Sequence, residues 1–267
     1  MKWFSWLAIV ALGVLMSMPA VAQPGRPPGP PLRVEAHPPF RSGPPRPPTV
    51  RFPDRFPPAF PPLVDHGGKP EGLDVSHFQH EIDWRAVRSS RAVFVYVKAT
   101  EGVDLPDELF AENWRGAGEV GLLRGAYHVF QPLDDGAAQA RFFLEVAKPR
   151  SGDLLPMLDV EVRKDVDAAT LLARVQAWLD TVEEALGVKP VVYTNPRFWN
   201  ALGGASFDAY PLWVAEYGVP APVVPTAWSR WTLWQHTRQG RVPGVVKPVD
   251  LDRFNGSFEE LRRAVIP

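Results

Sequence analysis

The stretch LPMLDVEV, residues 155–162, decides how the fold is interpreted, because it places two carboxylates inside an otherwise apolar run. Side chains of a β-strand alternate between its two faces, so residues two positions apart point the same way. Asp159 and Glu161 are therefore predicted to project together, with Val160 and Val162 on the opposite face. Two unpaired like charges are costly to bury in a core. The stretch thus predicts a strand that ends in a polar site.

Similar apolar runs recur along the chain and alternate with amphipathic stretches in its first part. The expected strands are 72–78, 92–100, 121–130, 155–161, 190–195, 211–217, 231–237 and 246–254. The expected helices are 82–89, 107–119, 134–148 and 167–187, the last beginning at Asp167 and ending at Gly187. This alternation predicts one α/β domain in which helices cover a parallel sheet. Eight strands favour closure into a barrel, although the later ones leave little room for full helices between them.

The two ends of the chain differ in composition. Lys2, an apolar run from Trp3 to Met18 and the sequence Ala20-Val21-Ala22 predict a secretory signal peptide over 1–22, with an uncleaved membrane anchor as the alternative. A Pro/Arg-rich linker is predicted over 23–62, and the catalytic domain over 63–267. The protein is therefore expected to be secreted or periplasmic, in the cell envelope, with no membrane contact after signal cleavage.

The linker and the domain carry opposite net charge. Residues 24–62 hold 16 of the 31 prolines, which favours an extended polyproline II spacer. Its arginines could alternatively contact anionic envelope polymers. Residues 63–267 carry an excess of acidic side chains, which argues against nucleic acid as a partner. The absence of cysteine from the sequence excludes disulfides, thiolate metal sites and cysteine nucleophiles.

Four acidic residues lie in or at the ends of predicted strands. Asp74 is in the first, Asp159 and Glu161 end the fourth, and Asp250 is in the last. The carboxyl ends of barrel strands meet at one rim, so these side chains are expected to converge. Such a set of acids is typical of a glycosidase, in which one carboxyl stays protonated as the general acid. Neighbouring like charges raise the pKa of that group.

Aromatic and histidine residues allow further interpretations. Aromatic side chains in or just after the strands could stack on sugar rings or could belong to the core: Tyr127, Tyr193, Trp199, Trp213, Tyr217 and Trp234. The spacing of His77, His80, His128 and His236 fits no compact zinc pattern. No metal and no cofactor are therefore expected.

Eight motifs follow one another over residues 72–256: GLDVSHFQ with IDW (72–84), VKATEG (97–102), GAYHVF (125–130), LDVE (158–161), YTNPRFW (193–199), LWVAEY (212–217), the Trp234-Gln235 pair and VDLDRFNG (249–256). Together they resemble the glycoside hydrolase family 25 lysozymes, the Chalaropsis-type muramidases. The resemblance implies an irregular TIM-like barrel of five β/α units followed by three strands. It also implies hydrolysis of the β-1,4 bond between N-acetylmuramic acid and N-acetylglucosamine in peptidoglycan.

The resemblance assigns roles to individual residues. Glu161 matches the general acid, and Asp159, Asp74 and Asp250 match the other active-site acids. Whether the nucleophile is an aspartate or the 2-acetamido group of the substrate stays open. Tyr127 would contact the reacting sugar, and further substrate contacts are expected from Tyr193, Trp213, Tyr217, Trp234 and Gln235.

Two residues depart from the family pattern. Asp252 stands where asparagine is common, and His80 stands where a small residue is usual. Two alternatives to a muramidase remain, namely a barrel that binds peptidoglycan without cleaving it and a glycosidase acting on another amino-sugar polymer such as chitin. The expected partner is the peptidoglycan glycan strand, and the protein is expected to be a monomer.

Overall fold

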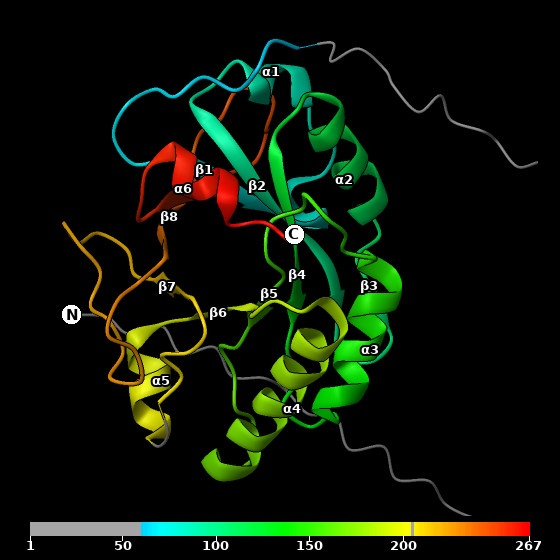
Figure 1. Cartoon of the computed structure of the whole chain (residues 1–267), viewed down its shortest axis with the longest axis vertical. Helices are drawn as coiled ribbons and strands as arrows, with labels where there is room; N and C mark the ends of the chain where they lie inside the picture. The colour runs from blue at the N-terminus through cyan, green and yellow to red at the C-terminus, as the bar shows by residue number, and fades with distance from the viewer. Residues whose placement is uncertain (1–59, 204–205) are drawn as a thin grey trace, which may run out of the picture. The chain divides into compact units, whose positions relative to one another are not determined.

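The computed structural model describes residues 60–203 and 206–267, so the predicted signal peptide and nearly all of the linker lie outside the described residues. Its centre is a nine-stranded sheet (Figure 1). The strands are β1 (Glu71–Val75), β2 (Ala92–Glu101), β3 (Leu105–Pro106), β4 (Leu123–Val129), β5 (Met157–Asp159), β6 (Val191–Thr194), β7 (Leu212–Ala215), β8 (Leu233–Gly240) and β9 (Val249–Phe254). Because β1 pairs with both β2 and β9, eight of these strands close into a barrel.

The order and direction of the strands decide which residues meet at each rim. From β1 through β2, β4, β5, β6 and β7 to β8, every neighbouring pair is parallel. β9 runs antiparallel between β8 and β1 and closes the ring, and β3 is a short antiparallel addition to β2. The start of β9 therefore lies beside the carboxyl end of β1, with Asp250 opposite Asp74. The predicted α/β barrel is confirmed.

Helices follow most of the parallel strands. They are α1 (Trp84–Arg88), α2 (Phe110–Glu119), α3 (Gly136–Ala147), α4 (Ala168–Leu186), α5 (Pro196–Leu202) and α6 (Phe258–Arg263), with a 3-10 turn at His77–Gln79. The Asp167 side chain accepts from the Thr170 amide at the start of α4, and Gly187 ends this helix at φ 69°. Both predicted ends of α4 are thus confirmed. The sequence did not predict β3, α5 or α6. Between residues 206 and 254 of the described chain, β7, β8 and β9 follow one another without a helix.

Buried side chains form two clusters that correspond to the two faces of the sheet. One cluster, which we call the interior cluster, includes Phe94, Tyr96 and Trp213. The other includes Val95 and Leu158 together with Trp178 of α4. The second cluster contains residues of α1 to α5 and lies between the strands and those helices, whereas the interior cluster fills the barrel and also includes Phe258 and Leu261 of α6. Figure 1 shows α2, α3 and α4 following one another along one side of the sheet. In the part of the chain that the structure describes, no helix is long and apolar enough to cross a membrane.

The prediction for residues 155–162 needs one correction. β5 ends at Asp159, so Glu161 lies in the loop after the strand rather than within it. Val160 is completely buried on the helix side, as alternation predicts, but Val162 is 45% exposed. Alternation holds only while the backbone stays in the sheet, and the chain leaves the sheet after Asp159.

Gly125 in β4 makes room for an aromatic ring of the interior cluster. A Cβ at this position would lie 2.4 Å from a ring atom of Tyr96, whose ring centroid is 4.7 Å from that of Trp213. Gly125→Ala is therefore expected to lower the free energy of unfolding by about 1–3 kcal/mol, measured by urea denaturation. The same substitution in a Tyr96→Val background should cost less, because the clashing ring is gone. Equal losses in the two backgrounds would contradict this explanation.

Candidate active site

A cavity of about 300 Å³ opens at the rim where the parallel strands end. It is lined by Asp74, Ser76, Phe78, Gln79, Tyr127, Met157, Asp159, Glu161, Tyr193, Tyr217, Gln235, Arg238 and Asp250. The four acids predicted from the sequence are all among these residues, together with three of the predicted aromatic residues and Gln235. The geometry of the barrel thus brings together residues that are far apart in the sequence.

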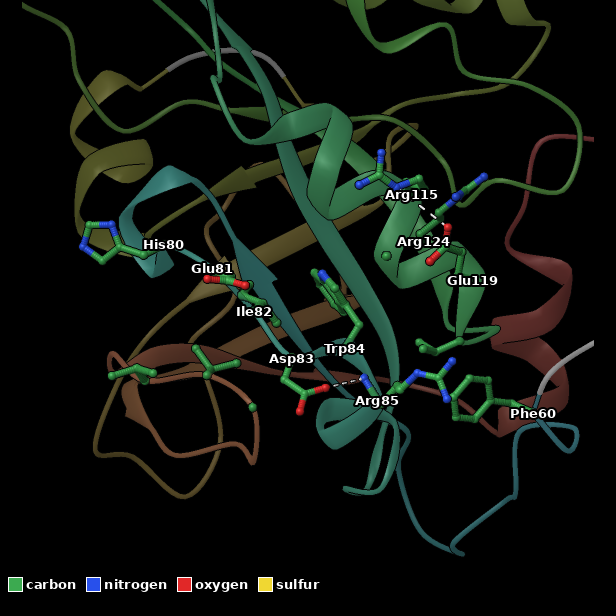
Figure 2. A pocket seen from close by; sticks show the side chains of 16 residues that line it. Phe60, His80, Glu81, Ile82, Asp83, Trp84, Arg85, Arg115, Glu119 and Arg124 are labelled. Carbon is green, nitrogen blue, oxygen red and sulfur yellow. Dashed lines mark hydrogen bonds and ion pairs between the residues drawn. The ribbon is translucent and has the colours of Figure 1, made fainter. Parts of the chain in front are cut away.

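A larger pocket of about 1750 Å³ lies on another part of the surface, against α1 and α2 (Figure 2). Its lining contains none of the predicted site residues. Two of its three carboxylates have local partners: Asp83 accepts from the backbone amides of Arg85 and Ala86, and Glu119 pairs with Arg115 at 3.7 Å. Size therefore does not single out the functional site, and the rim cavity is the candidate because the acids converge in it.

Asp74 is held by a chain of hydrogen bonds that crosses the barrel. The side-chain amide of Gln235 donates to Asp74 Oδ2 at 2.7 Å. The Gln235 Oε1 atom in turn accepts from the hydroxyl of Tyr193 at 2.8 Å and from that of Tyr217. Gln235, predicted to bind substrate, thus links an acid to two tyrosines, and it is 4% exposed. Burial raises the pKa of Asp74 well above its usual range, and the charge of Asp250 adds to this effect.

Asp159 and Glu161 lie side by side but differ in exposure. Asp159 ends β5 and is partly buried opposite Tyr193, whereas Glu161 is exposed in the following loop. Burial raises the pKa of Asp159 well above its usual range, and the charge of Glu161 raises it further. Burial also raises the pKa of Glu161, although a hydrogen bond with Asn195 opposes this shift. Because the two acids influence each other, they titrate as a coupled pair.

Asp250 shares the rim with an arginine that the sequence did not reveal. Burial raises the pKa of Asp250 to about 6, against the opposing effect of the Arg238 charge. The Arg238 guanidinium also lies over the ring of Tyr217, 5.7 Å from its centroid. β8 has irregularities in register between Gln235 and Thr237 and again before Gly240. These irregularities break the alternation of faces, so sequence spacing could not place Arg238 in the cavity.

Lys98 is a buried cation close to the acids. Its Nζ atom lies 2.7 Å from Glu101 Oε2, and Gln131 donates to the other oxygen of Glu101 at 2.6 Å. The Lys98 charge opposes the upward shift in the pKa of Asp159. The available signal was a lysine within the apolar run of residues 92–100, since buried lysines are rare unless paired.

Other lining residues that the sequence analysis missed come from the segment after β1. Ser76 and Gln79 form a capping box around the 3-10 turn, and Phe78 beside them is 68% exposed. An aromatic ring with so much exposed surface at the edge of a cavity can stack against the apolar face of a ligand. The signal was the phenylalanine within a polar turn, directly after the predicted first strand.

Two predicted substrate contacts do not fit their positions. Trp213 is completely buried within the interior cluster, and its indole N–H donates to Asp252 at 3.1 Å. Trp234 is 5% exposed and belongs to the helix-side cluster, where its indole N–H donates to the carbonyl of Glu216 at 2.8 Å. Neighbouring residues of β8 face opposite sides, so Trp234 points away from the cavity that Gln235 faces. Trp199 likewise packs against Phe207 and Trp228 in the core.

The histidines occupy separate places. Burial lowers the pKa of His128 to about 4, and this ring lies between Thr100 and Gln139, stacked on Trp178. His77 lies 2.7 Å from Asp107. His80 is exposed and has a φ of 58°, a conformation that glycine adopts more readily. Among the described residues, no group of three or more potential ligands is placed to hold a metal ion.

Comparison with known proteins gives a consistent result. The model of glycosyl hydrolases family 25 matches residues 73–245. Lysozyme M1 of Streptomyces globisporus is 37% identical over 204 residues, which cover 72% of this chain and 69% of that protein. The N,O-diacetylmuramidase of Chalaropsis sp is 31% identical over 210 residues, covering 72% and 97%. The crystal structure of the bacterial lysozyme from Streptomyces coelicolor superposes with a TM-score of 0.71 at 34% identity, covering 75% and 98%. The chain therefore belongs to glycosyl hydrolases family 25.

Proposed function

We propose that this protein is a peptidoglycan hydrolase, a lysozyme that cleaves the β-1,4 bond between N-acetylmuramic acid and N-acetylglucosamine. The observation that carries the proposal is the convergence of Asp74, Asp159, Glu161 and Asp250 in one rim cavity. Family membership and the lysozyme and muramidase relatives support the choice of polymer. The carboxylates supply acid–base chemistry without a cofactor.

Glu161 is proposed as the general acid. It is the exposed member of the pair that follows β5, so its carboxyl can reach a glycosidic oxygen in the cavity. Although the residue as a whole is exposed, its carboxyl lines the cavity and is partly withdrawn from water, which raises its pKa and favours the protonated form that a general acid needs. In this role Glu161 transfers its proton to the leaving oxygen as the glycosidic bond breaks.

Asp159 is proposed to act on the anomeric side of the same sugar. Burial and the neighbouring acids raise the pKa of Asp159, and the Lys98 charge, held by Glu101, opposes that shift and so favours the ionised form. An ionised Asp159 serves either of two routes. It can attack the anomeric carbon, or it can orient and polarise the substrate's 2-acetamido group for internal attack.

The remaining residues of the cavity are proposed to bind and orient the glycan strand. Tyr127, Tyr193 and Tyr217 form polar aromatic walls, and Phe78 provides an exposed ring at the edge. Two further acids determine the charge inside the cavity. Asp74 is held by Gln235, and Asp250 lies in the field of Arg238. Gln235 is proposed to position Asp74 rather than to bind sugar, because its amide already donates to this acid.

The proposal extends to the organisation of the whole chain. It includes the signal peptide at 1–22, the linker at 23–62, the catalytic domain at 63–267, a secreted or periplasmic location and a monomeric state. At the proposed boundary, the Arg88 guanidinium donates to the carbonyls of Pro61 and Pro62 at 2.9 and 3.1 Å, so the last linker residues lie against the domain. The division into five β/α units and three closing strands is supported by the order of the elements.

The test is digestion of purified peptidoglycan and of chitin by the whole chain, with mass spectrometry of the released fragments. We expect muropeptides with reducing N-acetylmuramic acid ends from peptidoglycan and no release from chitin. Reducing N-acetylglucosamine ends or products from chitin would assign a different glycosidase activity. Binding to walls of several chemotypes without any release would refute the hydrolase and identify a binding module.

A further inference from the structure

Asp252 is a fully buried carboxyl group behind the proposed catalytic acids. It lies in β9 opposite Gln235 of β8 and Gly72 of β1, and it is 0% exposed. Its Oδ1 atom accepts from the Trp213 indole N–H at 3.1 Å. The other oxygen, Oδ2, is buried and has no hydrogen-bond donor facing it in the described residues. An ionised carboxylate would leave that oxygen unsatisfied, which is strongly unfavourable in a protein interior.

The charges that face Asp252 are acidic. Asp74 of β1 and Asp250 of β9 both act on it, and Tyr96 of β2 is the further titratable group beside it. The nearest basic neighbour in sequence, Arg253, points to the other side of β9, where it lies over the Trp234 ring and 4.0 Å from Glu71. Arg238 acts on Asp250 rather than on Asp252. The Trp213 hydrogen bond favours a negative charge on Asp252, but no basic group among the described residues acts on this carboxyl.

The electrostatics favour one proton shared between two carboxyl groups. Burial raises the pKa of Asp252 well above its usual range, and the charges of Asp74 and Asp250 raise it further. The approach of the two carboxyls to one another also raises the pKa of Asp252, while it lowers that of Asp74. These opposite effects, together with the unsatisfied Oδ2 atom, favour a proton on Asp252 and ionisation of Asp74.

We propose that Asp252 is a positioning residue, a protonated carboxyl that donates a hydrogen bond from Oδ2 to Asp74. Gln235 and Asp252 then hold Asp74 from two sides. Protonated Oδ2 of Asp252 donates to the Asp74 carboxylate and is no longer unsatisfied. Trp213, which cannot reach a sugar, anchors Asp252 through Oδ1. The assignment of a proton to Asp252 depends only on the residues around it. The effect of Asp252 on turnover also rests on the proposed function.

Asparagine would reproduce these contacts without an ionisable group. Its oxygen accepts from Trp213, and its amide donates where the acid proton did. A group whose pKa is raised by folding stabilises the protein most below its unfolded pKa, about 3.9 for aspartate. That stabilisation is lost as the pH rises toward the folded pKa. As the pH rises from about 4 through neutral toward the folded pKa, the wild-type protein should thus lose more stability than Asp252→Asn.

The experiment compares the whole chain with Asp252→Asn, Asp252→Leu and Asp104→Asn, the last replacing an exposed aspartate as a control. Unfolding midpoints are measured across that pH range without substrate, and carboxyl ¹³C NMR titrations follow Asp252 and Asp74. We expect the midpoint of Asp252→Asn to exceed that of wild type by a margin that grows with pH, and Asp104→Asn to follow wild type. The Asp252 signal should be that of a protonated carboxyl near neutral pH, and Asp74 should titrate at higher pH in Asp252→Leu than in Asp252→Asn.

Activity supplies the second part of the test. Loss of the donor in Asp252→Leu should lower kcat by up to about 100-fold with little change in KM, because Asp74 is misplaced. Asp252→Asn should recover most of that loss. Parallel pH curves for wild type and Asp252→Asn, or an ionised Asp252 signal near neutral pH, would overturn the proposal. If the protein turned over no glycan at all, the proposed function would fail, and the unfolding and NMR measurements would still decide the state of Asp252.

Discussion

Replacing Glu161 with glutamine is expected to lower kcat on peptidoglycan by about 10²–10⁴-fold, the usual contribution of a general acid. Glutamine has the shape of glutamate but carries no acidic proton, so the leaving oxygen would depart without protonation. The fold should be unaffected, because Glu161 is exposed in the loop after β5. The measurement is the initial rate of muropeptide release together with the midpoint of thermal unfolding.

Glu145→Gln is the matched control for this variant. Glu145 is an exposed residue of α3 outside the cavity lining, so the same chemical change there should leave the rate of release unaltered. If the Glu161→Gln variant is folded and releases muropeptides at a rate within a few-fold of wild type, Glu161 is not the general acid. The rim cavity would then need another proton donor, and Asp250, with a pKa of about 6, would be the next candidate.

Asp159→Asn is expected to reduce kcat by about 10²–10³-fold, comparable to the loss of a preorganised electrostatic group. The same substitution should raise the unfolding midpoint at neutral pH. Burial raises the pKa of Asp159, so its stabilising contribution is present below an unfolded pKa of about 3.9 and declines as the pH rises. Asparagine has no ionisable group, so Asp159→Asn does not lose stability in this way as the pH rises. Activity and stability are therefore expected to change in opposite directions, as at sites where function is maintained at a cost in stability.

The measurement for Asp159→Asn pairs kcat with unfolding midpoints at mildly acidic and mildly alkaline pH, with Asp104→Asn as the exposed control. An unchanged kcat, or a midpoint that falls at every pH, would contradict the proposed role. Azide added to Asp159→Ala distinguishes the two routes. A glycosyl azide product indicates that a carboxylate attacks the anomeric carbon in the native enzyme, whereas its absence favours attack by the acetamido group.

Much of the fold was predictable because its signals are local. Asp167 and Gly187 mark the ends of α4 by capping chemistry that involves only neighbouring residues. The eight barrel strands were predictable from apolar runs bounded by polar residues. Short elements such as β3 and α6 carry no comparable periodic signal, and the structure adds them.

Which side of each strand faces the cavity was harder to predict. Barrel strands are buried on both faces, so their sequences are almost uniformly apolar and do not distinguish interior from exterior. Trp234 and Gln235 were both predicted to contact substrate, yet they face opposite sides of β8. Arg238 enters the cavity only because β8 is irregular in register. The acids were predictable because a carboxylate in an apolar strand has few structural reasons to be there.

The antiparallel ninth strand has a consequence for how the enzyme acquires its activity. Asp74 is held by Gln235, which lies 161 residues away in sequence. The strand that carries Asp74, β1, also pairs with β9, which is still farther along the chain. Such contacts form late, because the entropy of closing a long loop must be overcome before they contribute any stabilisation. A partly synthesised or partly folded chain therefore contains the acids of β1 and β5 without the ring that aligns them. Hydrolytic competence should therefore appear in a single step, when the ring closes.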